Sequence, residues 1–408
     1  MTDKESSTYM TEIGSFLQGS SRDREMSIQW LKSRIPSILQ DKSLQKKRAY
    51  EELIYSRNSE LRILNNWSSA AILVRSSKLL HFYPEKKCWI PKVSLPLDQG
   101  FEDFIFISGD TLKNLGAKST KFMGLKYYER QRGEKVSANL ISSRHTLVDL
   151  MSIPFMSNYF THNIVVYDGQ IFLEKWQKKK ASIDPYSMSG INLETILTKG
   201  DLLSKDNGGS PFEPAKNNAK KFNSLVNHHF PQSRFSILVS CEIDALKKKI
   251  SSKTKDTHGS RILSNYVEIK CRRTRRKRDL IVPLIQCYLA GTKTLVVGYR
   301  DEKCYLQEVQ EYNVAQLLDS FEDPIYSYKF FDKWFNLIMH FIIKAIDCPA
   351  SGSQKHYLME YSKKEKNLII TPTKLSPYQV DRTVSNQFIN WRKGLSTRMG
   401  PQGDIKLG

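Results

Sequence analysis

Two short segments place charged residues on either side of one hydrophobic residue: Glu242-Ile243-Asp244, with two carboxylates, and Glu268-Ile269-Lys270, with a carboxylate and an amine. Alternate side chains of a strand project to the same face, so we expect Glu242 beside Asp244 and Glu268 beside Lys270. Carboxylates in a partly dry cleft are costly unless a cation compensates their charge. Mg²⁺ and Mn²⁺ prefer oxygen ligands and keep positions open for water and phosphate oxygens. The triplets therefore predict a divalent-metal site that acts on phosphate esters.

One acidic triplet is weak evidence, because a chain of this composition contains roughly four by chance. A strand with a solvated charged face is the alternative interpretation of each. Together, the two triplets supply the carboxylate, carboxylate and lysine set of the restriction-endonuclease-like nuclease core. In such a core, metal ions activate water and shield the phosphate, while the lysine orients the water or stabilises developing charge.

The charge balance favours a polyanionic partner. Lys and Arg number 63 against 42 Asp and Glu, which gives a formal net charge of +21. A basic run, Arg272–Arg278, directly follows the second triplet. It has two interpretations: a solvated or nuclear-localisation-like loop, or a rim that follows phosphates beside the metal site.

The sequence does not favour a zinc protease, a nucleoside triphosphatase or a serine hydrolase, nor a membrane or secreted protein. The chain has no H-E-x-x-H, P-loop or G-x-S-x-G motif, and its six cysteines stand apart, as expected of reduced and mostly buried thiols. The longest apolar run, Trp334–Ile346, is shorter than the roughly 20 residues that span a bilayer. The first residues lack a secretory pattern. We expect a cytoplasmic protein with no membrane partner, and the basic run keeps a nuclear location open.

The pattern of elements indicates an α+β protein, with mixed β-sheets flanked by helices. We expect residues 1–20 to be flexible and residues 21–408 to form a single domain. Apolar spacing predicts two helices within residues 22–66, and the polar stretch 198–220 is typical of a linker. Asp168-Gly169, between two β-rich runs, predicts a hairpin. Strands are expected around both triplets and over TLVVGYRD, with helices over IVPLIQCYLAG and FFDKWFNLIMHFIIKAI.

In this order the motifs resemble the DXO family of decapping 5′–3′ exoribonucleases, over roughly residues 95–345. Its E-h-D and E-h-K motifs match the two triplets. The family's G-Φ-x-Φ-E motif is assigned to the segment from Gly209 to Glu213, although Ser210 stands where an apolar residue is expected. The arginine motif corresponds to Arg144, and the downstream glutamine to Gln286. A further family-like segment surrounds Glu102.

The resemblance implies a role for each matched residue. Glu213, Asp244, Glu268 and the backbone carbonyl of Ile269 would hold one Mg²⁺ or Mn²⁺. Glu242 would join Asp244 around a second ion.

The remaining matched residues are assigned to the substrate. Lys270 and Gln286 would position the scissile phosphate or the water. Arg144 would bind a phosphate near the 5′ end, and Glu102 would lie in the substrate site.

The activity that the resemblance implies is metal-dependent RNA decapping. Incomplete, unmethylated or nucleotide-derived caps such as NAD would be removed as whole units, followed by 5′–3′ degradation. RNA with a 5′ cap or 5′ phosphate is the expected partner, and an exoribonuclease partner is left open. Two alternatives remain: a catalytically silent RNA-binding stimulator of another exoribonuclease, and a DNA-processing nuclease with the same core.

Overall fold

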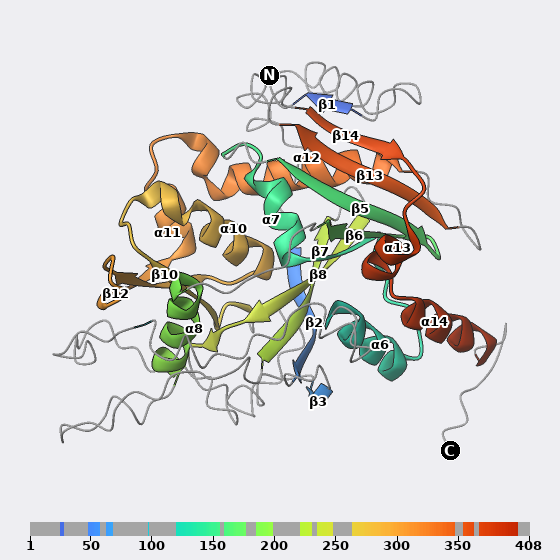
Figure 1. The fold of residues 1–408 in the computed structure, drawn as a ribbon, viewed down its shortest axis with the longest axis horizontal. Helices are drawn as coiled ribbons and strands as arrows, with labels where there is room; N and C mark the ends of the chain where they lie inside the picture. Colours follow the sequence, from blue (N-terminus) through green and yellow to red (C-terminus); the bar gives the residue numbers. More distant parts are fainter. Residues whose placement is uncertain are drawn as a thin grey trace.

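The computed structural model describes residues 25–27, 48–57, 63–67, 97, 120–155, 159–176, 185–198, 221–230, 235–247, 263–346, 354–362 and 367–398. They form two β-sheets with helices packed around them (Figure 1). The larger sheet joins segments from both ends of the chain, since β1 pairs with β14 near the C-terminus.

The larger sheet has ten strands in the order β1-β14-β13-β5-β6-β4-β8-β7-β2-β3. Their bounds are β1 Glu25–Ser27, β2 Arg48–Arg57, β3 Ile63–Trp67, β4 Leu140–Ser143, β5 Phe160–Tyr167, β6 Gln170–Lys175, β7 Lys221–Phe230, β8 Phe235–Ile243, β13 Lys355–Ser362 and β14 Asn367–Pro372. Strand β4 runs parallel to both of its neighbours, β6 and β8. The carboxyl ends of these three strands therefore lie on the same side of the sheet, at the ends of the strands. In such arrangements the loops that follow these ends carry ligand-binding residues.

The smaller sheet has four strands in the order β12-β11-β10-β9. Their bounds are β9 Ala245–Leu246, β10 Tyr266–Arg272, β11 Thr294–Arg300 and β12 Leu306–Asn313. Strand β9 follows β8 after a single residue and pairs antiparallel with β10, so the end of β8 is brought against β10. Strands β10 and β11 are parallel.

The helices cover both faces of the larger sheet and both faces of the smaller one. Their bounds are α6 Thr120–Arg132, α7 Arg144–Ser152, α8 Pro185–Thr198, η2 Lys277–Leu280, α10 Ile281–Ala290, α11 Val314–Asp319, η3 Pro324–Tyr326, α12 Tyr328–Ala345, α13 Pro377–Thr383 and α14 Asn386–Arg398. Helices α7, α10, α11 and α12 share the largest core with the strands. Helices α6, α13 and α14 pack on the opposite face, and α8 packs on the smaller sheet.

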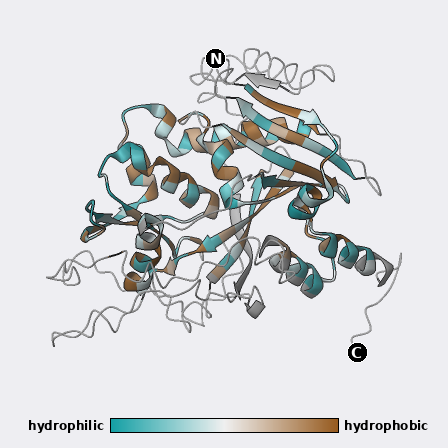
Figure 2. Cartoon of the chain, viewed as in Figure 1, coloured by the Kyte–Doolittle hydropathy of each residue, from teal (hydrophilic) through white to brown (hydrophobic). Residues whose placement is uncertain are grey.

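Burial of apolar surface explains this layering. Hydrophobic residues concentrate on the central strands and on α10 and α12 (Figure 2). Helix α12 buries aromatic side chains from Phe330 to Phe341 against the largest core. In the described part of the chain, no helix combines the length and the apolar character of a membrane span. Three of the four described cysteines are buried, and none of these four forms a disulfide within the described ranges.

The structure confirms the hairpin and most of the predicted strands and helices. Asp168 and Gly169 both adopt positive φ, 51° and 70°, which is the conformation that a two-residue hairpin turn requires. The second of the two helices predicted within residues 22–66 is wrong, because β2 and the start of β3 lie there, while most of the first lies outside the described residues, apart from β1. Pairing with β7 and β14 supplies tertiary contacts that override local helical spacing. Of the predicted linker 198–220, only residue 198 is described, at the end of α8; residues 1–20, predicted to be flexible, lie outside the described residues.

Candidate functional site

The two acidic triplets meet where the larger sheet joins the smaller one. Asp244 occupies the single position between β8 and β9, and Glu268 and Lys270 lie on β10. Arg144 begins α7 directly after β4. Because β4 and β8 are parallel neighbours, Arg144 and Asp244 both follow the carboxyl ends of these strands and lie on the same side of the sheet.

These side chains form one buried ionic cluster. The Arg144 guanidinium donates to Glu268 Oε2 at 2.5 Å. Lys270 contacts the other carboxylate oxygen of Glu268, and its Nζ lies 3.7 Å from Asp244 Oδ2. Asp244 and Glu268 are only 6% and 2% exposed. Two carboxylates at this depth require compensating cations, and Arg144 and Lys270 supply them.

The ionisation of the cluster reflects this balance. Burial, together with the negative charge of Glu268, raises the pKa of Asp244 to about 7. Burial also opposes ionisation of Glu268, but the positive charges of Arg144 and Lys270 outweigh it and lower the pKa of Glu268. Despite burial, the two carboxylates raise the pKa of Lys270. The cluster is therefore built to hold one ionised carboxylate beside a second one that protonates readily.

The donor atoms fit a divalent cation. Asp244 and Glu268 supply carboxylate oxygens, the ligands that Mg²⁺, Mn²⁺ and Ca²⁺ prefer. The Ile269 N–H donates to Asp244 Oδ2 at 2.8 Å. Since the N–H and C=O of one strand residue point to the same side of the strand, the Ile269 carbonyl also faces the side of Asp244. Its binding of a metal ion stays a prediction. The buried Oε1 of Gln286, on α10, lacks a hydrogen-bond donor among the described residues and is available to a bound water or ligand.

Of the remaining predicted site residues, the structure describes Glu242 but not Glu213 or Glu102. Glu242 is half-buried within β8, opposite Asn223 of β7. Glu213 and Glu102 lie outside the described residues. Among the residues that the structure does describe, no three Asp, Glu, His or Cys side chains are grouped closely enough to hold one metal ion. The assembly of Glu213 and Glu242 with Asp244 and Glu268 therefore stays a prediction, as does the binding of a phosphate by Arg144.

Helix α8 brings a further acid that the sequence analysis missed. The charge of Glu194, a half-buried residue of α8, contributes to the raised pKa of Asp244. Glu194 ends the segment Gly190-Ile191-Asn192-Leu193-Glu194, which fits G-Φ-x-Φ-E at every position. The segment assigned from sequence, ending at Glu213, departs from that motif at Ser210. A search for an apolar residue at both Φ positions would have selected Glu194.

Packing fixes α8 against the strand that carries the site. Leu193 belongs to the same apolar cluster as Val267 and Ile269 of β10. A Cβ atom added at Gly298 of β11 would lie 2.5 Å from Leu193 Cδ2, so glycine permits this close approach. The neighbouring Glu194 is thereby held near Asp244.

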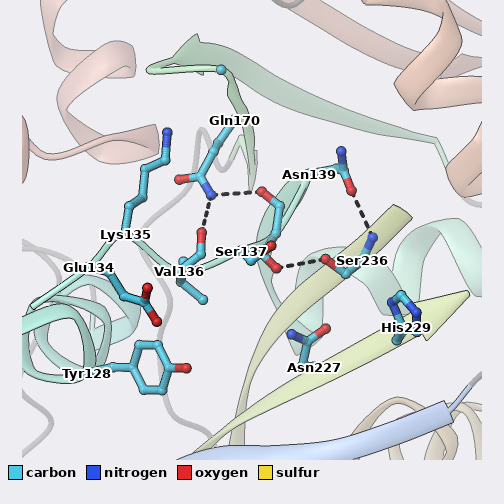
Figure 3. A pocket seen from close by; sticks show the side chains of 12 residues that line it. Tyr128, Glu134, Lys135, Val136, Ser137, Asn139, Gln170, Asn227, His229 and Ser236 are labelled. Carbon is cyan, nitrogen blue, oxygen red and sulfur yellow. Dashed lines mark hydrogen bonds between the residues drawn. The ribbon is translucent and has the colours of Figure 1, made fainter. Parts of the chain in front are cut away.

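A separate open cavity of about 500 Å³ lies at the amino ends of the same parallel strands, on the side of the larger sheet opposite the ionic cluster (Figure 3). Asn139, Gln170 and Ser236 line it from the amino ends of β4, β6 and β8. Tyr128 and His229 complete its polar wall. None of the predicted site residues lines this cavity, so the ionic cluster at the carboxyl ends remains the candidate active site.

Mixed β-sheets that bring an acid at the end of one strand beside a Glu-x-Lys pair on another define a nuclease of the PD-(D/E)XK class. The matching family model, described as RAI1 like PD-(D/E)XK nuclease, covers residues 47–390. The chain belongs to this family.

Curated relatives and solved structures agree with the assignment. The decapping nuclease RAI1 of Debaryomyces hansenii is 23% identical over 339 residues, which are 74% of this chain and 84% of the relative. The crystal structure of Scheffersomyces stipitis Rai1 with (3′-NADP)⁺ and calcium ion matches with a TM-score of 0.63 at 19% identity, covering 86% of this chain and 96% of that one. Candida albicans Rai1 in complex with pU5-Mn²⁺ matches with a TM-score of 0.64 at 17% identity, over the same shares.

These findings confirm two predictions made from the motifs. The resemblance to a decapping-nuclease family is correct, and so is the restriction-endonuclease-like core within an α+β fold. The motifs succeeded because E-h-D and E-h-K are each contiguous in sequence, the first at the end of β8 and the second within β10.

Proposed function

We propose that the chain is a metal-dependent RNA decapping nuclease that hydrolyses phosphodiester bonds at RNA 5′ ends. The observation that carries the proposal is the buried cluster of Asp244 and Glu268 with Lys270 and Arg144. A cluster with paired carboxylates and an adjacent lysine is suited to divalent-ion catalysis on phosphate esters. The net charge of +21 suits a polyanionic substrate.

In this proposal Asp244, Glu268 and the Ile269 carbonyl hold a Mg²⁺ or Mn²⁺ ion, with Glu194 as a further acid. A second ion near Glu242 remains part of the proposal. A bound divalent ion supplies an activated water nucleophile and offsets charge that develops on the phosphate.

The protein's own side chains position the reacting groups. Lys270 faces both buried carboxylates and is one-fifth exposed, so its ammonium can also donate to a phosphate oxygen or to the attacking water. The Arg144–Glu268 bond orients Glu268 and maintains its ionised form. Gln286 offers its buried Oε1 as an acceptor for a water proton.

The relatives support the choice of substrate. Curated relatives are named decapping nucleases, and related Rai1 structures contain (3′-NADP)⁺, 3′-FADP or pU5. We propose that this chain likewise removes incomplete, unmethylated or nucleotide-derived caps as whole units and then degrades the RNA 5′–3′.

The test compares two isosteric variants on 3′-labelled RNA that carries an NAD cap, an unmethylated cap or a 5′ monophosphate. Asp244→Asn removes the central carboxylate, and we expect cleavage in Mn²⁺ to fall more than about 100-fold. Asp319→Asn, at an exposed position of α11, is the matched control and should cleave like the wild type. Equal cleavage by both variants would remove the cluster from the mechanism.

The same assay decides between the proposal and its alternatives. A catalytically silent partner would show no divalent-dependent cleavage in the wild type. A DNA-processing nuclease would cleave a matched DNA strand at least as fast as RNA, whereas recognition of 2′-hydroxyl groups predicts a preference for RNA.

We also propose that the protein acts in RNA quality control in the cytoplasm. Fluorescence microscopy of the tagged chain tests the location, and accumulation in the nucleus would overturn it.

A further inference from the structure

The basic run that follows the second triplet forms an exposed ridge, Arg272–Arg278, at the end of β10. Six of its seven residues are Lys or Arg, and Arg273–Arg278 are exposed. Side chains at alternate strand positions share a face, so Arg272 lies on the same face as Glu268 and Lys270. The ridge therefore begins about 7 Å along the strand from Lys270, at roughly 3.3 Å per residue.

Some basic side chains of the ridge form ion pairs with acidic side chains, and others do not. Arg273 forms an ion pair with Glu302, and Arg275 forms one with Glu308 at 2.9 Å. Within the part of the chain that the structure describes, the guanidinium groups of Arg276 and Arg278 have no such acidic partner. When these two groups bind phosphates, cations condensed on the nucleic acid are released, which makes binding depend on salt.

An exposed aromatic ring lies beside the ridge. Tyr186 of α8 is 58% exposed, and the Arg300 guanidinium lies 4.5 Å from the centre of its ring. Arg300 directly follows Tyr299 of β11, which pairs with Arg272 of β10. An aromatic ring backed by arginine is a platform on which any nucleic-acid base can stack.

We propose that the ridge Arg272–Arg278, with Tyr186 and Arg300, binds the body of single-stranded RNA downstream of the bond that is cut. This inference rests on the proposed function, since it places the rest of the substrate beside the catalytic cluster. Arg276 and Arg278 bind backbone phosphates, and Tyr186 stacks on a base. The ridge thus retains long RNA without taking part in the chemistry.

Binding is measured by fluorescence anisotropy with a 3′-fluorescein oligouridine of about 20 nucleotides, in EDTA so that no cleavage occurs. The probe is titrated with the full chain between about 50 and 300 mM KCl. Each phosphate contact to single-stranded nucleic acid adds about 0.7 to the slope of log K against log[salt].

Arg276→Ala/Arg278→Ala should lower the slope by about 1.4 and weaken binding about 25-fold at 0.1 M salt. Arg273→Ala/Arg275→Ala is the matched control, because Glu302 and Glu308 already offset these charges. The control should change the slope by less than half as much. Equal slopes for the two double variants would overturn the assignment of phosphate contacts to Arg276 and Arg278.

Tyr186→Ala should weaken binding roughly tenfold with an unchanged slope, and Tyr186→Phe should bind like the wild type. If Tyr186→Ala binds like the wild type, the stacking platform is wrong.

Cleavage of a capped dinucleotide in Mn²⁺ separates this inference from the proposed function. The ridge variants should cleave the dinucleotide at the wild-type rate, because it is too short to reach the ridge. No cleavage by the wild-type chain would refute the proposed function itself. Unchanged RNA binding by Arg276→Ala/Arg278→Ala, combined with lost nuclear accumulation, would instead identify the ridge as an import signal and overturn RNA binding.

Discussion

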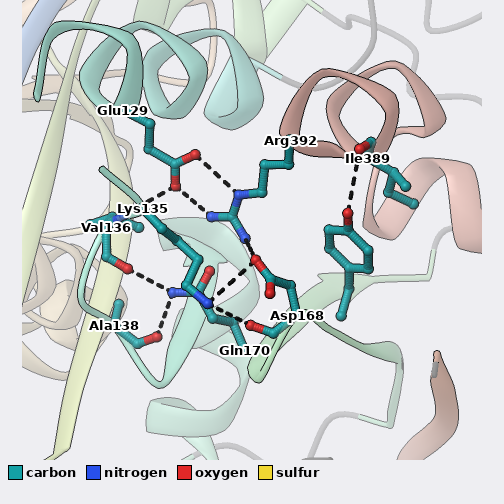
Figure 4. Close-up of polar contacts among 9 residues, drawn as sticks. Glu129, Lys135, Val136, Ala138, Asp168, Gln170, Ile389 and Arg392 are labelled. Atoms are coloured by element: carbon teal, nitrogen blue, oxygen red, sulfur yellow. Dashed lines mark hydrogen bonds and ion pairs between the residues drawn. The ribbon is translucent and has the colours of Figure 1, made fainter. Parts of the chain in front are cut away.

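Arg392 of α14 forms a buried ion pair with Glu129 of α6, and replacing Arg392 by methionine should strongly destabilise the protein. Arg392 Nε donates to Glu129 Oε2 at 3.0 Å, and a second guanidinium nitrogen donates to Glu129 Oε1 (Figure 4). The side chains are 3% and 0% exposed. Arg392 also lies 3.5 Å from Asp168 at the hairpin turn and 4.6 Å from the centre of the Phe388 ring.

The size of the effect follows from the burial of Glu129. Removing one partner of a buried ion pair costs about 3–5 kcal/mol, because the other charge is left without compensation. The Val136 N–H, which donates to Glu129 Oε1 at 3.2 Å, cannot replace a guanidinium. At about 2.1 cal/mol/K per residue, a protein of this length loses about 1 °C of Tm per kcal/mol. Arg392→Met should therefore lower Tm by about 3–6 °C.

The assay is chemical denaturation followed by tryptophan fluorescence, with Tm from calorimetry. Glu129→Gln/Arg392→Met removes both charges and should be more stable than Arg392→Met alone, since no buried charge remains. Removal of the exposed Arg273–Glu302 pair is the control and should cost less than about 1 kcal/mol. A loss below about 1 kcal/mol for Arg392→Met, or strictly additive effects in the double variant, would refute the reasoning.

Three further predictions concern the site and its surroundings. Glu194→Gln should reduce cleavage about 100-fold without changing Tm, whereas Glu213→Gln should have little effect; the reverse order in a kinetic assay would restore Glu213 as the acid. Gly298→Ala should reduce cleavage about tenfold, because the added methyl group displaces Leu193 and, with it, Glu194; wild-type rates would show that α8 accommodates the methyl group. Burial of His162, 3.5 Å from Asp149, lowers its pKa to about 4. The unfolded state therefore binds the extra proton between pH 6.5 and 4, so the contribution of His162 to stability is present above pH 6.5 and is lost as the pH falls toward 4. Denaturation of His162→Gln should show a flatter decline over this window, and an identical decline would contradict the reasoning.

The catalytic strands could be predicted because their signals are local. Glu268 and Lys270 are two positions apart on β10, and the period of a strand alone places them on one face. The ion pair between them confirms that geometry. The Asp168-Gly169 turn is equally local, because its positive φ values depend on two adjacent residues.

The N-terminal strands could not be predicted because their partners are distant in sequence. Residues of β2 and β3 show helical apolar spacing, but β2 pairs with β7 more than 150 positions later. Pairing at that separation depends on the whole sheet, and it overrides local preference.

The sequence alone determined the family, the nuclease core and the residues of both triplets, because each motif is a run of neighbouring residues on or directly after one strand. Only the tertiary structure decided how the triplets meet. The turn from β8 to β9 brings Asp244 to Ile269, and α7 brings Arg144 to Glu268. The nearness of Glu194 to Asp244 also depends on α8 packing against β10, since the charge of Glu194 acts on Asp244 across 50 residues of sequence. Long-range packing sets these distances, and no local pattern encodes them.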